Sequence, residues 1–182
     1  MDRVRLRKDT GRCNMERLAA LSQEELDALT DAILQAERIY VAGFGRAGNY
    51  IKIMAMNCAQ AGLKSYVVGD NATPAIQPDD LLIIGSGSGE TKTMVLIAEQ
   101  CKTHGAKLAL ISANTNSTIG KLADINVEIP SQDSPEESVE EYFSKGSFYH
   151  LMAMVCDCVL AYVLDASNLS VQDVYDNHNN LE

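Results

Sequence analysis

The stretch "LLIIGSGSGET" at residues 81–91 decides the fold, because four apolar residues lead directly into a turn rich in glycine, serine and threonine. A short apolar run bounded by glycine is typical of a strand that is buried on both faces of a parallel sheet. Glycines let the backbone turn tightly and approach a ligand. The helix expected to follow presents unpaired N–H groups and the positive end of its dipole. The pattern therefore indicates a strand, an anion-binding turn and a helix in succession.

Similar apolar segments recur on both sides of this stretch, and helical patterns lie between them. We expect strands at residues 38–43, 65–69, 81–85, 107–112 and 125–130. We expect helices at residues 22–37, from the end of the first strand to about 61, and at about 90–103, 117–124, 147–165 and 170–179. Strands that alternate with helices specify an α/β fold, in which a parallel sheet is covered on both faces. Ligands bind such sheets outside the carboxyl ends of the strands.

The length of 182 residues suits one domain with a substantial core. We assign residues 21–182 to this domain and treat residues 1–20 as an N-terminal arm or helix. Leu18 and Leu21 favour a short helix there, whereas the first dozen residues are typical of a mobile arm.

Composition excludes several classes of function. A net charge of −10 argues against a nucleic-acid partner, and residues 128–182 hold eleven of the acidic side chains but only one basic side chain. Five cysteines without a CxxC pair indicate reduced thiols in a cytoplasmic protein. The three histidines lack metal-ligand spacing, so we expect no metal site. No continuous apolar run is long enough to span a bilayer, and no secretory signal is present, so we expect no membrane partner.

The turn at residues 85–91 carries the strongest functional signal. Ser86, Ser88 and Thr91 add hydroxyl donors to the backbone N–H groups, a combination that suits a phosphate. The spacing does not fit a Walker A loop. The alternative is an ordinary turn that caps the next helix.

A second glycine-rich turn, "GFGRAG", follows the first expected strand at residues 43–48. Arg46 in this turn could balance the charge of a phosphate, or it could be a surface arginine. No acidic residue ends the next expected strand in the position that would bind a ribose, so NAD binding is a weak alternative despite the glycine spacing. A third turn, "NTNST" at residues 114–118, could line the same crevice through Asn114, Ser117 and Thr118 or cap a short helix.

These motifs together resemble the SIS (sugar isomerase) domain family. The turn Ser86-x-Ser88-Gly89-x-Thr91 resembles the phosphosugar-binding signature of that family, and "AGFGRAG", "YVVGDNATPAI", "NSTIGKLAD" and the ending "HNNLE" occur in the order found in its 6-phospho-3-hexuloisomerase branch. The resemblance covers residues 22–182.

The resemblance implies a three-layer, flavodoxin-like domain with a five-stranded parallel sheet, and a homotetramer or dimer. It implies interconversion of D-arabino-hex-3-ulose 6-phosphate and fructose 6-phosphate through an enediol, in the ribulose monophosphate route of formaldehyde fixation, without a metal or nucleotide cofactor. The substrate-binding positions that it implies are Gly45, Arg46, Ala47, Ser86, Gly87, Ser88, Gly89, Glu90 and Thr91.

Two positions depart from the family pattern. Ala47 stands where the family usually has a serine. No glutamate, the base proposed for the family, lies within the helix expected at residues 147–165. Counting back from Asp157 places Tyr149 at that position, and counting forward from Gly146-Ser147 places His150 there. Histidine suits proton transfer at neutral pH, whereas tyrosine is a poor base but can donate a hydrogen bond.

The catalytic candidates are therefore His150, Tyr149 and His178. His178 lies in the "HNNLE" ending, and the resemblance allows it to act in the site of a neighbouring subunit. Packing in the core is the alternative for Tyr149 and His150, and attachment of the C-terminus is the alternative for His178. Because the glutamate is missing, a non-catalytic phosphosugar-binding protein and an isomerase of another sugar phosphate stay open as functions.

The long apolar helix also bears on assembly. Leu151, Val155, Val159 and Tyr162 form one stripe along it, and a helix that is apolar on more than one face is expected to pack against another subunit. Cys156 and Cys158 are expected to be buried thiols.

Overall fold

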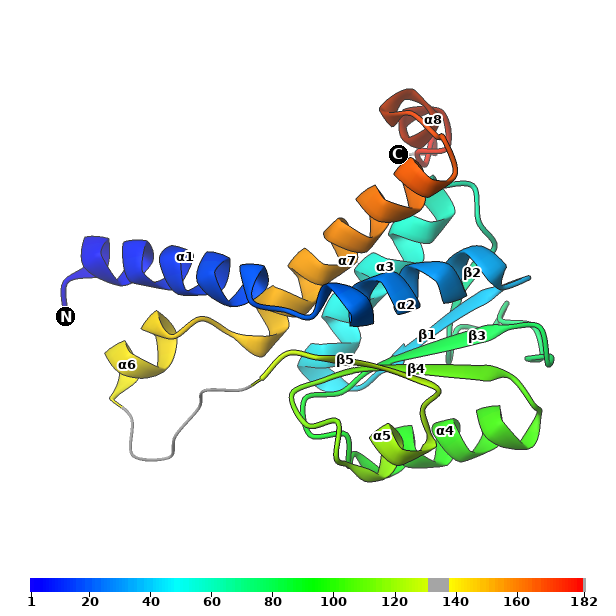
Figure 1. Cartoon of the computed structure of the whole chain (residues 1–182), viewed down its shortest axis with the longest axis horizontal. Coiled ribbons are helices and arrows are strands. Elements are labelled where there is room, and N and C mark those ends of the chain that lie inside the picture. The colour runs from blue at the N-terminus through cyan, green and yellow to red at the C-terminus, as the bar shows by residue number, and fades with distance from the viewer. Residues whose placement is uncertain (131–137, 182) are drawn as a thin grey trace.

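The computed structural model describes residues 1–130 and 138–181, and its fold is an α/β sandwich (Figure 1). The strands are Ile39–Gly43 (β1), Ser65–Val67 (β2), Leu81–Gly85 (β3), Lys107–Ser112 (β4) and Ile125–Glu128 (β5). The helices are Arg3–Ala19 (α1), Gln23–Gln35 (α2), Gly45–Gln60 (α3), Lys92–Thr103 (α4), Thr118–Leu122 (α5), Val139–Ser144 (α6), Phe148–Ala166 (α7) and Val171–Asp176 (α8).

The five strands form one parallel sheet in the order β2-β1-β3-β4-β5. This order is the flavodoxin-like one, so the expected fold class is confirmed. Two strands are shorter than expected: β2 ends at Val67 and β5 at Glu128. In the central pair, Gly43 of β1 lies opposite Gly85 of β3, so the two glycine-rich turns begin side by side.

Alternate residues of each central strand enter two separate cores. In β3, Leu81 and Ile83 pack with α2, α3 and α7 on one face of the sheet, whereas Leu82 and Ile84 pack with α4 and α5 on the other. Figure 1 shows these helices as layers on opposite sides of the sheet. Burial on both faces explains why the strands are continuously apolar rather than alternating.

The N-terminal segment is helical rather than a loose arm. Helix α1 begins at Arg3, where Asp2 caps it by accepting hydrogen bonds from the N–H groups of Val4 and Arg5. It extends away from the sheet and lies beside α6 (Figure 1). Helix α6 was not expected: Glu140 and Glu141 lie in its first turn, and Ser138 and Glu141 form a capping box.

Helix α7 is a core element. Leu151, Val155 and Val159 are fully buried against the sheet-side core of their own chain, so these residues of the apolar stripe are unavailable to another subunit, and Tyr162 is only partly buried. The stretch Val139–Ala166 is long and apolar enough to span a membrane by length and composition. A core helix passes the same test, and the packing of α7 on α2 and α3 accounts for its apolar character.

The cysteines are free thiols, as expected. Cys58 and Cys156 are buried, and burial raises the pKa of each thiol to about 12. Cys158 was also expected to be buried, but its side chain is only partly buried.

Candidate functional site

The candidate site lies at the carboxyl edge of the sheet, between β1 and β3. The chain leaves β1 into α3 on one face of the sheet and leaves β3 toward α4 on the opposite face. A crevice opens where neighbouring strands send their connections to opposite faces, and this is where open α/β sheets bind ligands. The two glycine-rich turns found in the sequence both lie at this point.

The first turn brings the start of α3 close to the end of β1. A Cβ atom added to Gly48 would lie 2.6 Å from the carbonyl oxygen of Gly43, so the helix can start this close only with glycine there. No side chain caps α3, and its first N–H groups face the crevice edge. Gly45 and Arg46 are exposed at this helix start, but the Ala47 side chain packs in the core. Ala47 can therefore contribute only its backbone.

The second turn holds its hydroxyl groups in place through its own backbone. Ser86 Oγ accepts a hydrogen bond from Gly89 N at 3.2 Å, and Ser88 Oγ accepts one from Glu90 N at 3.2 Å. Each hydroxyl thus keeps its proton for another acceptor. Ser88 is exposed, whereas Ser86 is buried and supports the turn from below. Thr91 makes no side-chain cap on α4, so its hydroxyl and the first N–H groups of α4 are open to an anion.

The Glu90 side chain connects the second turn to the third turn. Its Oε1 accepts a hydrogen bond from Thr118 N at 2.7 Å, and the bonds from Thr118 lower the pKa of the Glu90 carboxyl. Glu90 thus holds the third turn in this structure, and its contact with a substrate stays a prediction. Ser117 caps α5 through Gly120 N, and the Asn114 amide donates to the Ser88 carbonyl at 3.4 Å. The third turn therefore caps α5 and also braces the second turn.

The first turn of α7 completes the site. Phe148 packs against Gly87, where a Cβ atom would meet its ring at 3.5 Å. The guanidinium carbon of Arg46 lies 4.5 Å from the centre of the Tyr149 ring, a cation–π contact. Tyr50 of α3 packs against both Tyr149 and His150, with ring centres 6.2 and 6.0 Å apart. Helices α3 and α7 thus bring Arg46, Tyr149 and His150 together.

A cavity of about 30 Å³ lies among these side chains. Its lining residues are Thr10, Arg46, Tyr142, Phe143, Gly146, Ser147, Phe148, Tyr149 and His150. The cavity is far smaller than a sugar phosphate, so it marks where the side chains converge rather than the volume of a ligand. Thr10, Tyr50 and Ser147 were missed in the sequence, because only the tertiary contacts of α1, α3 and α7 bring them here.

His178 lies elsewhere. It follows α8 and is exposed, with its Nδ1 3.1 Å from the carbonyl oxygen of Asn179. The neighbouring Asn177 donates a hydrogen bond to the Gln60 carbonyl at the C-terminal end of α3. The site is at the other end of that 16-residue helix, on the order of 24 Å away at 1.5 Å per residue. Within one chain, His178 cannot join Tyr149 and His150.

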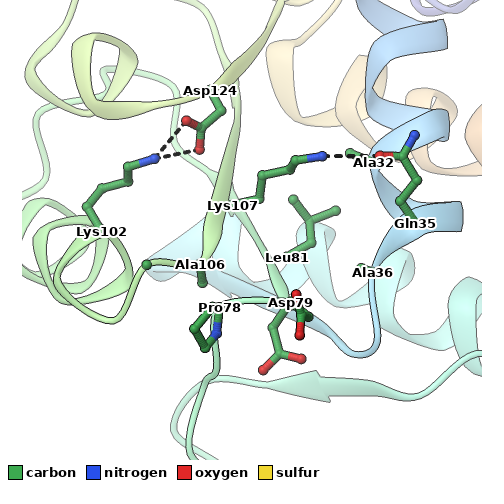
Figure 2. Close-up of a pocket in the computed structure, with 12 residues that line it drawn as sticks. Ala32, Gln35, Ala36, Pro78, Asp79, Leu81, Lys102, Ala106, Lys107 and Asp124 are labelled. Atoms are coloured by element: carbon green, nitrogen blue, oxygen red, sulfur yellow. Dashed lines mark hydrogen bonds and ion pairs between the residues drawn. The ribbon is translucent and has the colours of Figure 1, made fainter.

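A larger cavity, of about 360 Å³, lies at the opposite edge of the sheet (Figure 2). It opens where β3 and β4 begin, between the C-terminal ends of α2 and α4. Two of its charged groups are paired with each other, since Lys102 Nζ lies 2.7 Å from Asp124 Oδ2, and Lys107 Nζ donates to the Gln35 side chain at 3.3 Å. Because this is the amino edge of a parallel sheet, we do not place the site there.

The chain is similar to known proteins over most of its length. A model of the SIS domain matches residues 32–155. A 3-hexulose-6-phosphate isomerase from Bacillus subtilis (strain 168) is 35% identical over 167 residues, which are 90% of this chain and 90% of that protein. A protein of the same name from Mycobacterium gastri is 32% identical over 166 residues, which are 90% of this chain and 83% of that protein.

A solved structure is similar over nearly the same length. The crystal structure of a hypothetical protein from Methanococcus jannaschii, for which a molecular function of 3-hexulose-6-phosphate isomerase was inferred, superposes with a TM-score of 0.78. It is 29% identical in sequence, and the match covers 88% of this chain and 87% of that chain. The family model alone spans more than half of the chain, and the chain therefore belongs to the SIS domain family.

Proposed function

We propose that the protein is a sugar-phosphate isomerase that interconverts D-arabino-hex-3-ulose 6-phosphate and fructose 6-phosphate. The observation that carries the proposal is the meeting of a phosphate-type turn with a cation and a titratable side chain at one crevice. The names of the relatives narrow the substrate to a 3-hexulose 6-phosphate. In a cell, the reaction would belong to formaldehyde fixation through the ribulose monophosphate route.

The phosphate of the substrate is held by the second turn. Ser88, Thr91 and the N–H groups at the start of α4 donate hydrogen bonds to its oxygens, and the helix dipole favours its charge. Arg46 adds a positive charge from the neighbouring turn, to which it is free to move from its stacked position on Tyr149. Ser86 keeps the turn in shape by binding Gly89 N.

The isomerisation moves one proton between neighbouring carbons. A base removes the proton from C2 of the 3-ketose, the electron pair of that C–H bond becomes the C2–C3 double bond, and the C3 carbonyl oxygen takes up a proton to give an enediol. The proton then returns to C3 as the C2 hydroxyl gives up its own proton and the C2 oxygen becomes the carbonyl. No external oxidant is needed, since C2 is oxidised as C3 is reduced. His150 is the base, and Tyr149 is placed to donate a hydrogen bond to a developing oxyanion.

Turnover of hex-3-ulose 6-phosphate to fructose 6-phosphate by the purified protein tests this function. Appearance of fructose 6-phosphate is followed by a coupled assay. Binding of the sugar phosphate without turnover would instead support the non-catalytic alternative, which the missing glutamate favours. Turnover of a different sugar phosphate alone would keep the reaction class and replace the substrate.

Loss of the Ser88 hydroxyl tests the position of the phosphate. Ser88→Ala is expected to weaken the binding of fructose 6-phosphate by about 1 to 3 kcal/mol, because a charged oxygen loses its donor. Isothermal titration calorimetry measures the change in Kd. Thr103→Ala, at the other end of α4, is the matched control and should bind as the parent does. Unchanged affinity in Ser88→Ala would remove the phosphate from this turn.

The protein works as a homotetramer or dimer in the cytoplasm, without membrane or nucleic-acid partners. In support, α1 and α6 together expose apolar side chains, among them Val4, Met15, Val139 and Phe143. A second copy of the chain would cover these side chains. Sedimentation velocity should give a dimer or tetramer for the parent and a smaller species for Met15→Lys. A monomeric parent would rule out this assembly.

A further inference from the structure

Helix α1 is attached to the chain segment that leads into α7. Thr10 Oγ1 donates a hydrogen bond to the Phe143 carbonyl at 2.8 Å, and the Arg17 guanidinium donates to the Lys145 carbonyl at 3.1 Å. Between these two contacts, Asn14 Oδ1 accepts a hydrogen bond from Ser147 N at 3.2 Å. Arg17 also donates to the Pro130 carbonyl, at the end of the chain that follows β5. One face of α1 thus binds the backbone on both sides of Gly146.

Asn14 is the central contact of the set. It is only 8% exposed, which is unusual for an asparagine on a helix that otherwise points into solvent. Gly146 has a φ of +79°, and a Cβ atom added there would overlap the Asn14 amide. The tight fit of the Asn14 side chain against Gly146 leaves the next residue, Ser147, in one position.

Ser147 in turn sets the first turn of α7. It is the N-cap of that helix, and its Oγ accepts a hydrogen bond from Tyr149 N at 3.3 Å. Tyr149 and His150 are therefore two and three residues from the backbone N–H that Asn14 binds. Thr10 of α1 also lines the cavity that these two side chains share with Arg46. The N-terminal helix is thus one wall of the candidate site.

We propose that Asn14 is a positioning residue of the active site. By binding Ser147 N, it fixes the first turn of α7 so that Tyr149 and His150 face Arg46 and the crevice. This inference rests on the proposed function for its effect on turnover, but its effect on the position of His150 is independent of the substrate. Helix α1 then contributes to the chemistry without touching the sugar.

Three variants separate positioning from general damage. Asn14→Leu has a similar volume but cannot accept the Ser147 N–H bond. Asn14→Asp keeps an acceptor oxygen there, and an acidic group near a helix N-terminus is favourable. Glu16→Gln, on an exposed part of the same helix, is the matched control. If Asn14→Leu does not fold, Thr10→Val takes its place, since it removes one partly exposed hydrogen bond of the same contact.

The expected kinetic result is a loss confined to kcat. Asn14→Leu should lower kcat by on the order of 10- to 100-fold with little change in KM, because the phosphate turn is on other elements. Asn14→Asp should recover most of kcat, and Glu16→Gln should behave as the parent. A fall in kcat that Asn14→Asp does not recover, or an equal loss in Glu16→Gln, would overturn the proposal.

The second readout is the ring resonance of His150 in a ¹H–¹³C NMR spectrum. The chain has only three histidines, so His104 and His178 serve as internal references. We expect the His150 resonance to shift in Asn14→Leu, or in Thr10→Val, while the other two stay in place. If the parent shows no turnover but His150 shifts, the proposed function fails and the positioning holds. If the His150 resonance is unchanged in a folded variant, the positioning fails whatever the parent does.

Discussion

Replacing His150 with alanine is expected to lower kcat for the interconversion of the two hexulose phosphates by on the order of 100- to 10,000-fold. KM should change little, because the groups that hold the phosphate lie on the turn after β3 and at the start of α4. His150 is partly buried in the first turn of α7, next to Tyr50 of α3. Its imidazole ring can both accept and release a proton, which is the chemistry that the isomerisation needs. Steady-state kinetics on the purified variant measure both constants.

Two further variants make this test specific. His104→Ala changes an exposed histidine that caps the C-terminus of α4, far from the crevice, and should leave kcat unchanged. His150→Glu puts the family's carboxylate at the position reached by counting forward from Gly146-Ser147, and should be much more active than His150→Ala. Full activity in His150→Ala would remove this residue from the mechanism. Full activity in His150→Ala, combined with a lower kcat in His178→Ala, would instead assign the base to the C-terminal segment of a neighbouring subunit.

Replacing Gly89 with alanine is expected to lower the free energy of unfolding by about 2 to 5 kcal/mol, the sum of a left-handed backbone and an overpacked site. Gly89 has a φ of +64°. A Cβ atom there would overlap the Ser117 hydroxyl and lie 2.5 Å from Ser117 Cβ and 3.1 Å from the Asn114 carbonyl oxygen. Ser117 is 1% exposed and cannot move aside easily. The second and third turns would be forced apart, so binding of fructose 6-phosphate should be lost as well.

Gly87→Ala is the matched control, two residues earlier in the same turn. A Cβ atom there meets only ring carbons of Phe148, at 3.5 and 3.6 Å, which is ordinary contact. Urea denaturation should therefore place Gly87→Ala near the parent and Gly89→Ala well below it. Equal stability of the two variants would mean that the third turn does not pack on Gly89 as described.

The sheet could be predicted from sequence because the pattern that identifies each strand lies within a few consecutive residues. A run such as Leu81–Gly85 is apolar without alternation and ends in glycine, and that pattern is sufficient for a strand buried on both faces. The candidate crevice followed from one rule, since the carboxyl ends of neighbouring parallel strands meet. The largest differences in strand length, two residues each, are in β2 and β5 at the two edges of the sheet, where burial is weaker.

The contribution of α1 could not be predicted in the same way. Its sequence is polar on nearly all sides, so it lacks the apolar stripe that identifies a packed helix. It is held instead by hydrogen bonds that Thr10 and Arg17 donate to backbone carbonyl groups and that Asn14 accepts from a backbone N–H group, all near residue 145. A contact to a backbone group does not require a particular side chain at the residue contacted, so the sequence of that residue does not reveal it. The role of Glu90 was missed for a similar reason, because its partner is the Thr118 N–H group.

The assignment of Tyr149 and His150 to the crevice depended on the resemblance to the family, and the roles of these residues stay predictions. Their side chains lie near Arg46, which is about a hundred residues earlier in the chain and on a different helix. No spacing rule connects such positions. The two counts along α7 named neighbouring residues, and the structure brings both to the same cavity.

Because each strand packs into two separate cores, β3 does not tolerate an insertion or a deletion. Successive residues of Leu81–Gly85 belong to opposite faces, and the strand leads without a spacer into Ser86. One inserted codon within β3 would exchange the two faces and also displace the phosphate turn by about 3.3 Å. Folding and ligand binding would fail together. Changes of chain length are thus excluded from the strand that carries the phosphate turn.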